Sequence, residues 1–235
     1  VYNIGYTFGM ISSLAVNAFT TAWYPYFNSF VSRQEESRAI FARIATYYVA
    51  VFGVVTVFFF VFAKPLVIMF AQPPFYQSHW VIGPITLANV FSGLFCVVLP
   101  GIYFAQEVRL VNIVQVVSCF LVVMLNAILI PSMGLIGAAM AMAIGFAAMA
   151  MFQLMLNRIR GYLAIEYQWK RLLRFTSLFI TAILPVYVLQ PETLLANIAV
   201  SISLFLAALA GCWIILEHDE KLKIKSRLAR ISQTV

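Results

Sequence analysis

Long uncharged segments separated by short polar gaps dominate this chain of 235 residues. Hydrophobic residues make up 63% of the chain and charged residues 10%. Soluble domains are about 45–50% apolar and about 25% charged. Because so few charges cannot cover a water-soluble surface, we expect an all-α integral membrane protein. Membrane-spanning β-strands would need segments of alternating polarity, whereas these segments are apolar on every face.

The uncharged segments predict about seven transmembrane helices, since a spanning helix needs about 20 mostly apolar residues. The two longest segments are divided by Pro- and Gly-containing turns at 72–79 and 131–134. The expected spans are 1–30, 44–70, 80–105, 109–130, 135–157, 170–189 and 194–216. This gives five helices within 1–157, a basic cytoplasmic connector at 158–174, two additional helices within 175–216 and a basic cytoplasmic tail at 217–235. The chain has no initiator Met and starts inside an apolar segment, so we expect a fragment that lacks its N-terminal part.

Fourteen of the fifteen Lys and Arg residues fall in alternate gaps between these segments, and only Lys64 breaks the pattern. Cytoplasmic loops of membrane proteins carry the excess of Lys and Arg. Residue 1 is therefore expected on the outer side and the C-terminus in the cytoplasm. The same rule accounts for the high pI of about 9.5, so the expected partners are membrane lipids and no nucleic acid.

Uncharged polar residues inside the spans are the main site candidates, namely Asn17, Asn112, Gln115 and Asn126. An amide in hydrocarbon is costly unless it is paired or faces a watery cavity. Interhelical hydrogen bonding and cavity lining both remain open for these four residues. Lys64, near the outer end of the second span, either extends its ammonium group to the headgroups or contacts an anion.

A second group of residues is expected to act in helix packing or as hinges. Proline removes a backbone hydrogen bond and can kink a helix, and small residues allow helices to approach closely in lipid. These residues are Pro25, Pro100, Pro131, Gly134, Gly137 and Gly145. We expect no catalytic residues, metal site or cofactor, because the only two histidines, His79 and His218, fall on opposite sides of the predicted membrane.

The segment 125–139, LNAILIPSMGLIGAA, resembles the LN-x-x-LIP-x-x-G-x-x-GAA element of bacterial polysaccharide flippases. These belong to the multidrug/oligosaccharidyl-lipid/polysaccharide exporter superfamily. Two further stretches are similar to the family in the same order: Ile4-Gly5-Tyr6 with Ala22-Trp23-Tyr24-Pro25, and 166–173, EYQWKRLL.

The resemblance implies two six-helix lobes around a central cavity, with two extra helices, of which this chain is the last seven of fourteen. It implies a bacterial inner-membrane protein that moves undecaprenyl-diphosphate-linked oligosaccharide to the outer leaflet by alternating access, with glycan polymerase machinery as a further partner. The family cavity is commonly cationic. Here only Lys64 and Arg109 lie at or near membrane depth, so the main charged site is expected in the missing part.

Three alternatives stay open. One is a multidrug or metabolite exporter of the same superfamily, which predicts acidic residues within the spans. Another is a membrane-embedded glycan polymerase or acyltransferase, which usually needs a large external loop or clustered His, Asp or Arg residues. The third is a structural subunit of a glycan-assembly complex. The sequence does not identify the glycan, the coupling ion or the oligomeric state.

Overall fold

A computed structural model describes residues 2–189 and 193–216, and the elements in these ranges are all helical. The order is α1 (Tyr2–Asn28), α2 (Gln34–Val61), α3 (Ala63–Phe70), the 3₁₀-helix η1 (Pro73–Ser78), α4 (His79–Val97), α5 (Pro100–Phe104), α6 (Val108–Met133), α7 (Leu135–Ile159), α8 (Trp169–Val188) and α9 (Leu194–Ile215). The tail 217–235, including His218, lies outside the described residues. The all-α prediction is confirmed for the described ranges.

The described residues contain six helices that are long and apolar enough to cross a membrane, rather than the seven that we predicted. They correspond to α2, the run from η1 through α5, α6, α7, α8 and α9. The predicted first span forms α1, which is long enough at 27 residues but is not among the six. It carries several exposed polar residues, which are described below.

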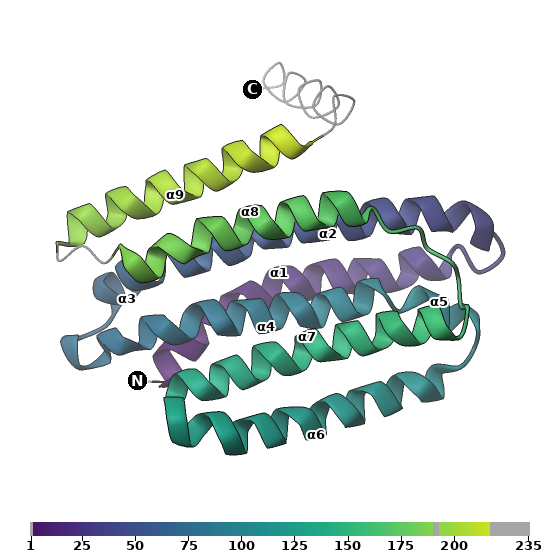
Figure 1. Ribbon diagram of the computed structural model, residues 1–235, viewed down its shortest axis with the longest axis horizontal. Coiled ribbons are helices and arrows are strands. Elements are labelled where there is room, and N and C mark those ends of the chain that lie inside the picture. Colours follow the sequence, from purple (N-terminus) through teal and green to yellow (C-terminus); the bar gives the residue numbers. More distant parts are fainter. Residues whose placement is uncertain (1, 190–192, 217–235) are drawn as a thin grey trace.

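The long helices run alternately in opposite directions, so their connections gather at two ends of the bundle (Figure 1). One end holds the α1–α2, α5–α6 and α7–α8 connections, and the other holds the segment from α3 to the start of α4, the α6–α7 corner, the end of α8 and the start of α9. Of the ten described Lys and Arg residues, nine lie in or near the first group of connections and Lys64 lies in the second group. The bundle thus separates charge between its two ends as the sequence predicted.

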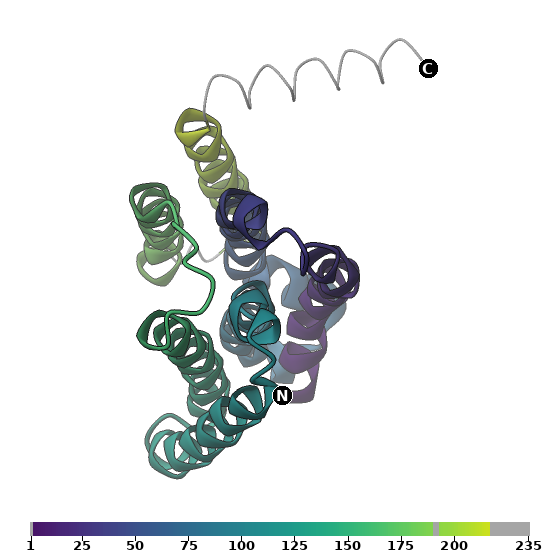
Figure 2. The ribbon, with the colours of Figure 1, turned by 90° about the vertical axis from the view of Figure 1, so that its right-hand side faces the viewer.

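Helix α4 occupies the middle of the bundle (Figure 2). Its most extensive contacts are with α7 and α1, and α6 packs mainly on α7. The row α1–α4–α7–α6 therefore has α1 and α6 at its edges. Gly5 and Gly9 let α1 approach α4 closely: a Cβ at Gly5 would collide with the backbone carbonyl of Ser78, and one at Gly9 with the side chain of Ile85.

Three predicted boundaries were wrong. Helix α2 ends at Val61 and α3 follows from Ala63, where the expected second span continued unbroken to 70. Helix α2 begins at Gln34, ten residues before the expected start at 44. The charged residues of its first turns pair along the helix, with Arg38 2.8 Å from Glu35, so this part can remain helical beyond the apolar segment. Helix α6 continues through Pro131 to Met133, and Gly134 alone makes the corner with φ +58°, a region that favours glycine.

Candidate functional site

One exposed side of α6 carries polar side chains interspersed with the exposed Val116 and Val123, and the neighbouring exposed side is apolar. Asn112, Gln115 and Cys119 are exposed and Asn126 is half-buried; their spacing of three, four and seven residues places them on one face. The apolar exposed face carries Ile113, Val117, Phe120 and Met124, each at least half exposed. Val111, Val114 and Ser118 are buried and form the packing face. We call the first set the α6 polar face.

Helix α1 is divided in a similar way. Its buried residues include Gly5, Gly9, Ser12, Val16 and Trp23, which share one side. Its exposed polar residues, the α1 polar face, recur at helical spacing on another side: Asn3, Thr7, Asn17, Thr21 and Asn28. The structure therefore places Asn17, Asn112 and Gln115 on the surface of the two helices that edge the row, and not in hydrogen bonds at the centre of the bundle.

Other amides are hydrogen-bonded inside the bundle, either to a neighbouring helix or within α7. Asn89, buried on α4, donates to the Gly9 carbonyl at 3.2 Å and to the Ser12 hydroxyl at 3.1 Å. On α7, the fully buried Gln153 donates to Asn157 at 2.9 Å, and Asn157 donates to the Val98 carbonyl at 2.6 Å. Sequence analysis did not single out Gln153 and Asn157, although their i, i+4 spacing near the end of a predicted span was visible.

The predicted packing and hinge residues lie at three kinds of position. Gly137 and Gly145 face α6: a Cβ at Gly145 would collide with the Val122 side chain, and one at Gly137 with the Leu129 carbonyl. Pro25 is exposed within α1, and Pro131 is in the last turn of α6. Pro100 starts α5 directly after the break that ends α4.

The α4–α5 break leaves carbonyl groups that side chains of neighbouring helices satisfy. Pro100 has no N–H to offer to the carbonyl of Cys96, four residues earlier. Trp23 of α1 donates its indole N–H to this carbonyl at 2.9 Å, and the Leu99 N–H approaches it at 3.3 Å. The Val98 carbonyl, within the same break, accepts from Asn157 of α7. Side chains of α1 and α7 thus both hydrogen-bond to the backbone at the break.

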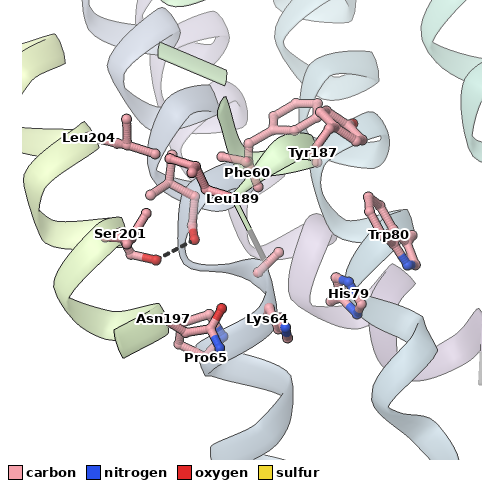
Figure 3. Close-up of a pocket in the computed structure, with 15 residues that line it drawn as sticks. Phe60, Lys64, Pro65, His79, Trp80, Tyr187, Leu189, Asn197, Ser201 and Leu204 are labelled. Atoms are coloured by element: carbon pink, nitrogen blue, oxygen red, sulfur yellow. Dashed lines mark hydrogen bonds between the residues drawn. The ribbon is translucent and has the colours of Figure 1, made fainter. Parts of the chain in front are cut away.

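A second break, between α2 and α3, follows the same rule. Pro65 removes the donor that would reach the carbonyl of Val61. Ser201 of α9, which is buried, donates its hydroxyl to that carbonyl at 2.8 Å (Figure 3). Lys64 lies at this break and lines a cavity between α2–α3, α4, α8 and α9, together with His79, Asn197 and Ser201 (Figure 3). Lys64 is therefore in a different place from the polar faces of α1 and α6.

Comparison with known proteins finds no matching family model and no matching curated protein. Among the described residues, no group of three or more His, Cys, Asp or Glu side chains is placed to hold a metal ion. In the described residues, the geometry offers polar residues on the exposed sides of α1 and α6, proline breaks whose carbonyls are hydrogen-bonded by neighbouring helices, and a cavity at the end of the bundle opposite the basic connections.

Proposed function

We propose that this chain is part of a bacterial flippase that moves lipid-linked oligosaccharide across the inner membrane by alternating access. The observation that carries the proposal is the α6 polar face. Asn112 and Gln115 are exposed on a helix that is long and apolar enough to span a membrane. Amides exposed at membrane depth are costly unless they meet water or a polar partner.

The two exposed sides of α6 suit different surroundings. The side that carries Phe120 and Met124 is apolar and suits lipid. The polar face suits a water-filled cavity through which hydroxyl-rich sugars pass, because amides both donate and accept hydrogen bonds. The α1 polar face, with Asn17 and Thr21, supplies the same chemistry at the other edge of the row. In the proposal both faces line the cavity of a two-lobed transporter.

The charge distribution favours one orientation in the membrane. Nine of the ten described Lys and Arg residues lie in or near the connections at one end of the bundle. In the proposal this end is cytoplasmic, following the excess of Lys and Arg on that side of membrane proteins, and the end with Lys64 is external. The similarity of segment 125–139 to polysaccharide flippases supplies the substrate class.

The test is to delete the gene that encodes this chain in the host bacterium and restore it as wild type or as Asn112→Leu/Gln115→Leu. Deletion and the double variant should reduce surface polysaccharide and accumulate lipid-linked repeat units in the inner leaflet. Phe120→Leu, on the apolar face of the same helix, is the matched control and should restore both measures. Unchanged surface polysaccharide without accumulation after deletion would refute the flippase proposal. If the double variant fully restores surface polysaccharide, the α6 polar face has no role in transport.

A further inference from the structure

The start of α8 presents two exposed cations on one face of the helix. Lys170 and Arg174 are four residues apart and both are exposed, so their side chains are neighbours on the helix surface. Neither side chain forms a salt bridge or a hydrogen bond with another residue in the described part of the chain. Arg171, which lies between them in sequence, instead donates to Gln168 at 2.9 Å. The exposed ammonium and guanidinium groups therefore keep their hydrogen-bond donors for a ligand.

The charges around these two residues favour a bound anion. The first turn of α8 contains no acidic residue, and its N-cap residue Gln168 makes no side-chain capping hydrogen bond. Like charges four residues apart on a helix repel each other, and the helix dipole disfavours cations at an N-terminus. By contrast, α2 has acidic residues in its first turn and α7 has Arg158 in its last turn, which the dipole stabilises. An anion between Lys170 and Arg174 would therefore relieve both repulsions.

An apolar stripe runs beside the two cations and continues along α8. Trp169 begins the helix and is more than half exposed, and such rings settle at the headgroup level of a membrane. Leu173, Ile180 and Leu184 recur at helical spacing and are also more than half exposed. The helix has 20 residues, a length of about 30 Å, which matches the hydrocarbon core of a bilayer. The cations thus lie at one edge of the hydrocarbon, and acyl chains can lie along the apolar stripe.

We propose that the start of α8 binds one anionic phospholipid, with its phosphate between Lys170 and Arg174 and its acyl chains along the apolar stripe. The start of α8 lies at the end of the bundle that holds the basic connections (Figure 1). In the proposed orientation the lipid therefore belongs to the cytoplasmic leaflet, whose anionic lipids attract Lys and Arg residues near the surface. The site is separate from the α1 and α6 polar faces, and the inference goes beyond the proposed function.

The experiment is native mass spectrometry of the purified full chain in detergent with added phosphatidylglycerol, and separately with phosphatidylethanolamine. Wild type should retain phosphatidylglycerol at lower lipid concentration than phosphatidylethanolamine, because the ammonium group of the second lipid cancels its phosphate charge. Each basic residue near an anionic lipid surface raises affinity about fivefold. We therefore expect Lys170→Gln/Arg174→Gln to weaken phosphatidylglycerol binding roughly thirtyfold, whereas Lys170→Arg/Arg174→Lys, which keeps both charges, should retain binding.

Arg158→Gln/Arg160→Gln is the matched control, because it removes two exposed positive charges from the same end of the bundle, at the C-terminus of α7. It should bind phosphatidylglycerol as wild type does, and circular dichroism checks that each variant keeps its helices. Equal binding of phosphatidylglycerol by the two double Gln variants would refute the site, because any attraction would then follow the total charge of this end. Equal binding of the two lipids by wild type would refute it as well. Either result would leave the flippase proposal untouched, since its readout is surface glycan.

Discussion

Replacing Trp23 by Phe tests whether the α4–α5 break depends on a side chain from α1. In the structure the Trp23 indole donates to the Cys96 carbonyl, which Pro100 deprives of its usual donor. Phenylalanine removes the N–H and keeps an aromatic ring against Phe41, whose centroid is 5.2 Å from that of Trp23. We therefore expect Trp23→Phe to destabilise the bundle mainly through the lost hydrogen bond.

Two ranges of free energy bound the destabilisation expected for Trp23→Phe. A buried polar group left without a partner costs roughly 1–3 kcal/mol in proteins, whereas interhelical hydrogen bonds measured in a membrane protein average about 0.6 kcal/mol and reach about 1.7. The Leu99 N–H, 3.3 Å from the same carbonyl, remains as a weak second donor. We therefore expect about 1 kcal/mol, a change of about fivefold in the unfolding equilibrium.

A double-mutant cycle with Pro100→Ala isolates the hydrogen bond from the lost ring volume. Alanine at position 100 restores a backbone N–H that can reach the Cys96 carbonyl four residues earlier. Trp23→Phe should then cost about 1 kcal/mol less in the Pro100→Ala background than in the wild type, because loss of ring volume contributes to both and cancels. Unfolding in mixed detergent micelles, followed by circular dichroism, measures both costs.

Trp213→Phe is the control for this cycle, because Trp213 is 38% exposed on α9 and its replacement should cost the same in both backgrounds. Equal costs of Trp23→Phe with and without Pro100 would refute the reasoning. The indole would then stabilise the bundle only by packing, and the carbonyl at the break would need no partner.

Three further predictions follow from the packing and topology. Asn89→Leu should lower the stability of the bundle by about 1 kcal/mol in the same unfolding assay, since it removes the hydrogen bonds of Asn89 to the Gly9 carbonyl, the Met10 sulfur and the Ser12 hydroxyl of α1; an unchanged midpoint would mean that these bonds add nothing to the α1–α4 contact. Gly5→Ala should be more destabilising than Gly211→Ala, because the added Cβ meets a backbone carbonyl at Gly5 and only the flexible tip of a leucine at Gly211. Cysteine introduced at Gln77 should react with a membrane-impermeant thiol reagent from outside the cell and cysteine at Arg160 only after the membrane is opened; the reverse pattern would overturn the proposed orientation.

The positions of the long helices could largely be read from the sequence, because the uncharged segments are long enough for them, although six rather than seven are apolar enough to cross a membrane. The residues at which the helices begin and end could be predicted less well. Charges usually mark loops in such chains, so the sequence predicts a loop at Arg38, yet the pairing of Arg38 with Glu35 lets α2 continue into the polar region. The polar residues of α1 are visible in the sequence, but they lie within an uncharged segment that is long enough to span a membrane.

The candidate site could be predicted only in part. The helical period places Asn112 and Gln115 on one face of α6, but whether that face is buried or exposed depends on which side of α6 packs against α7. Asn89 is also an amide inside a predicted span, and the structure pairs it with α1. Nothing within either helix distinguishes the two cases, since the difference arises from the neighbouring helices.

At the proline breaks, the carbonyl that needs a new donor can be predicted from the sequence, but the donor itself cannot. Each proline identifies the carbonyl four residues before it as a group that needs a new donor, so Cys96 and Val61 could be named in advance. The donors, Trp23 and Ser201, lie 73 and 140 residues away along the chain. Because Ser201 belongs to α9, the last helix of the described bundle completes the hydrogen bonding of α2. Helix α8 also packs closely on α2, since a Cβ added at Gly53 would collide with the Phe179 side chain. Helices α8 and α9 are therefore structural parts of the same bundle as α2, and removing them would expose an unpaired carbonyl beside Lys64.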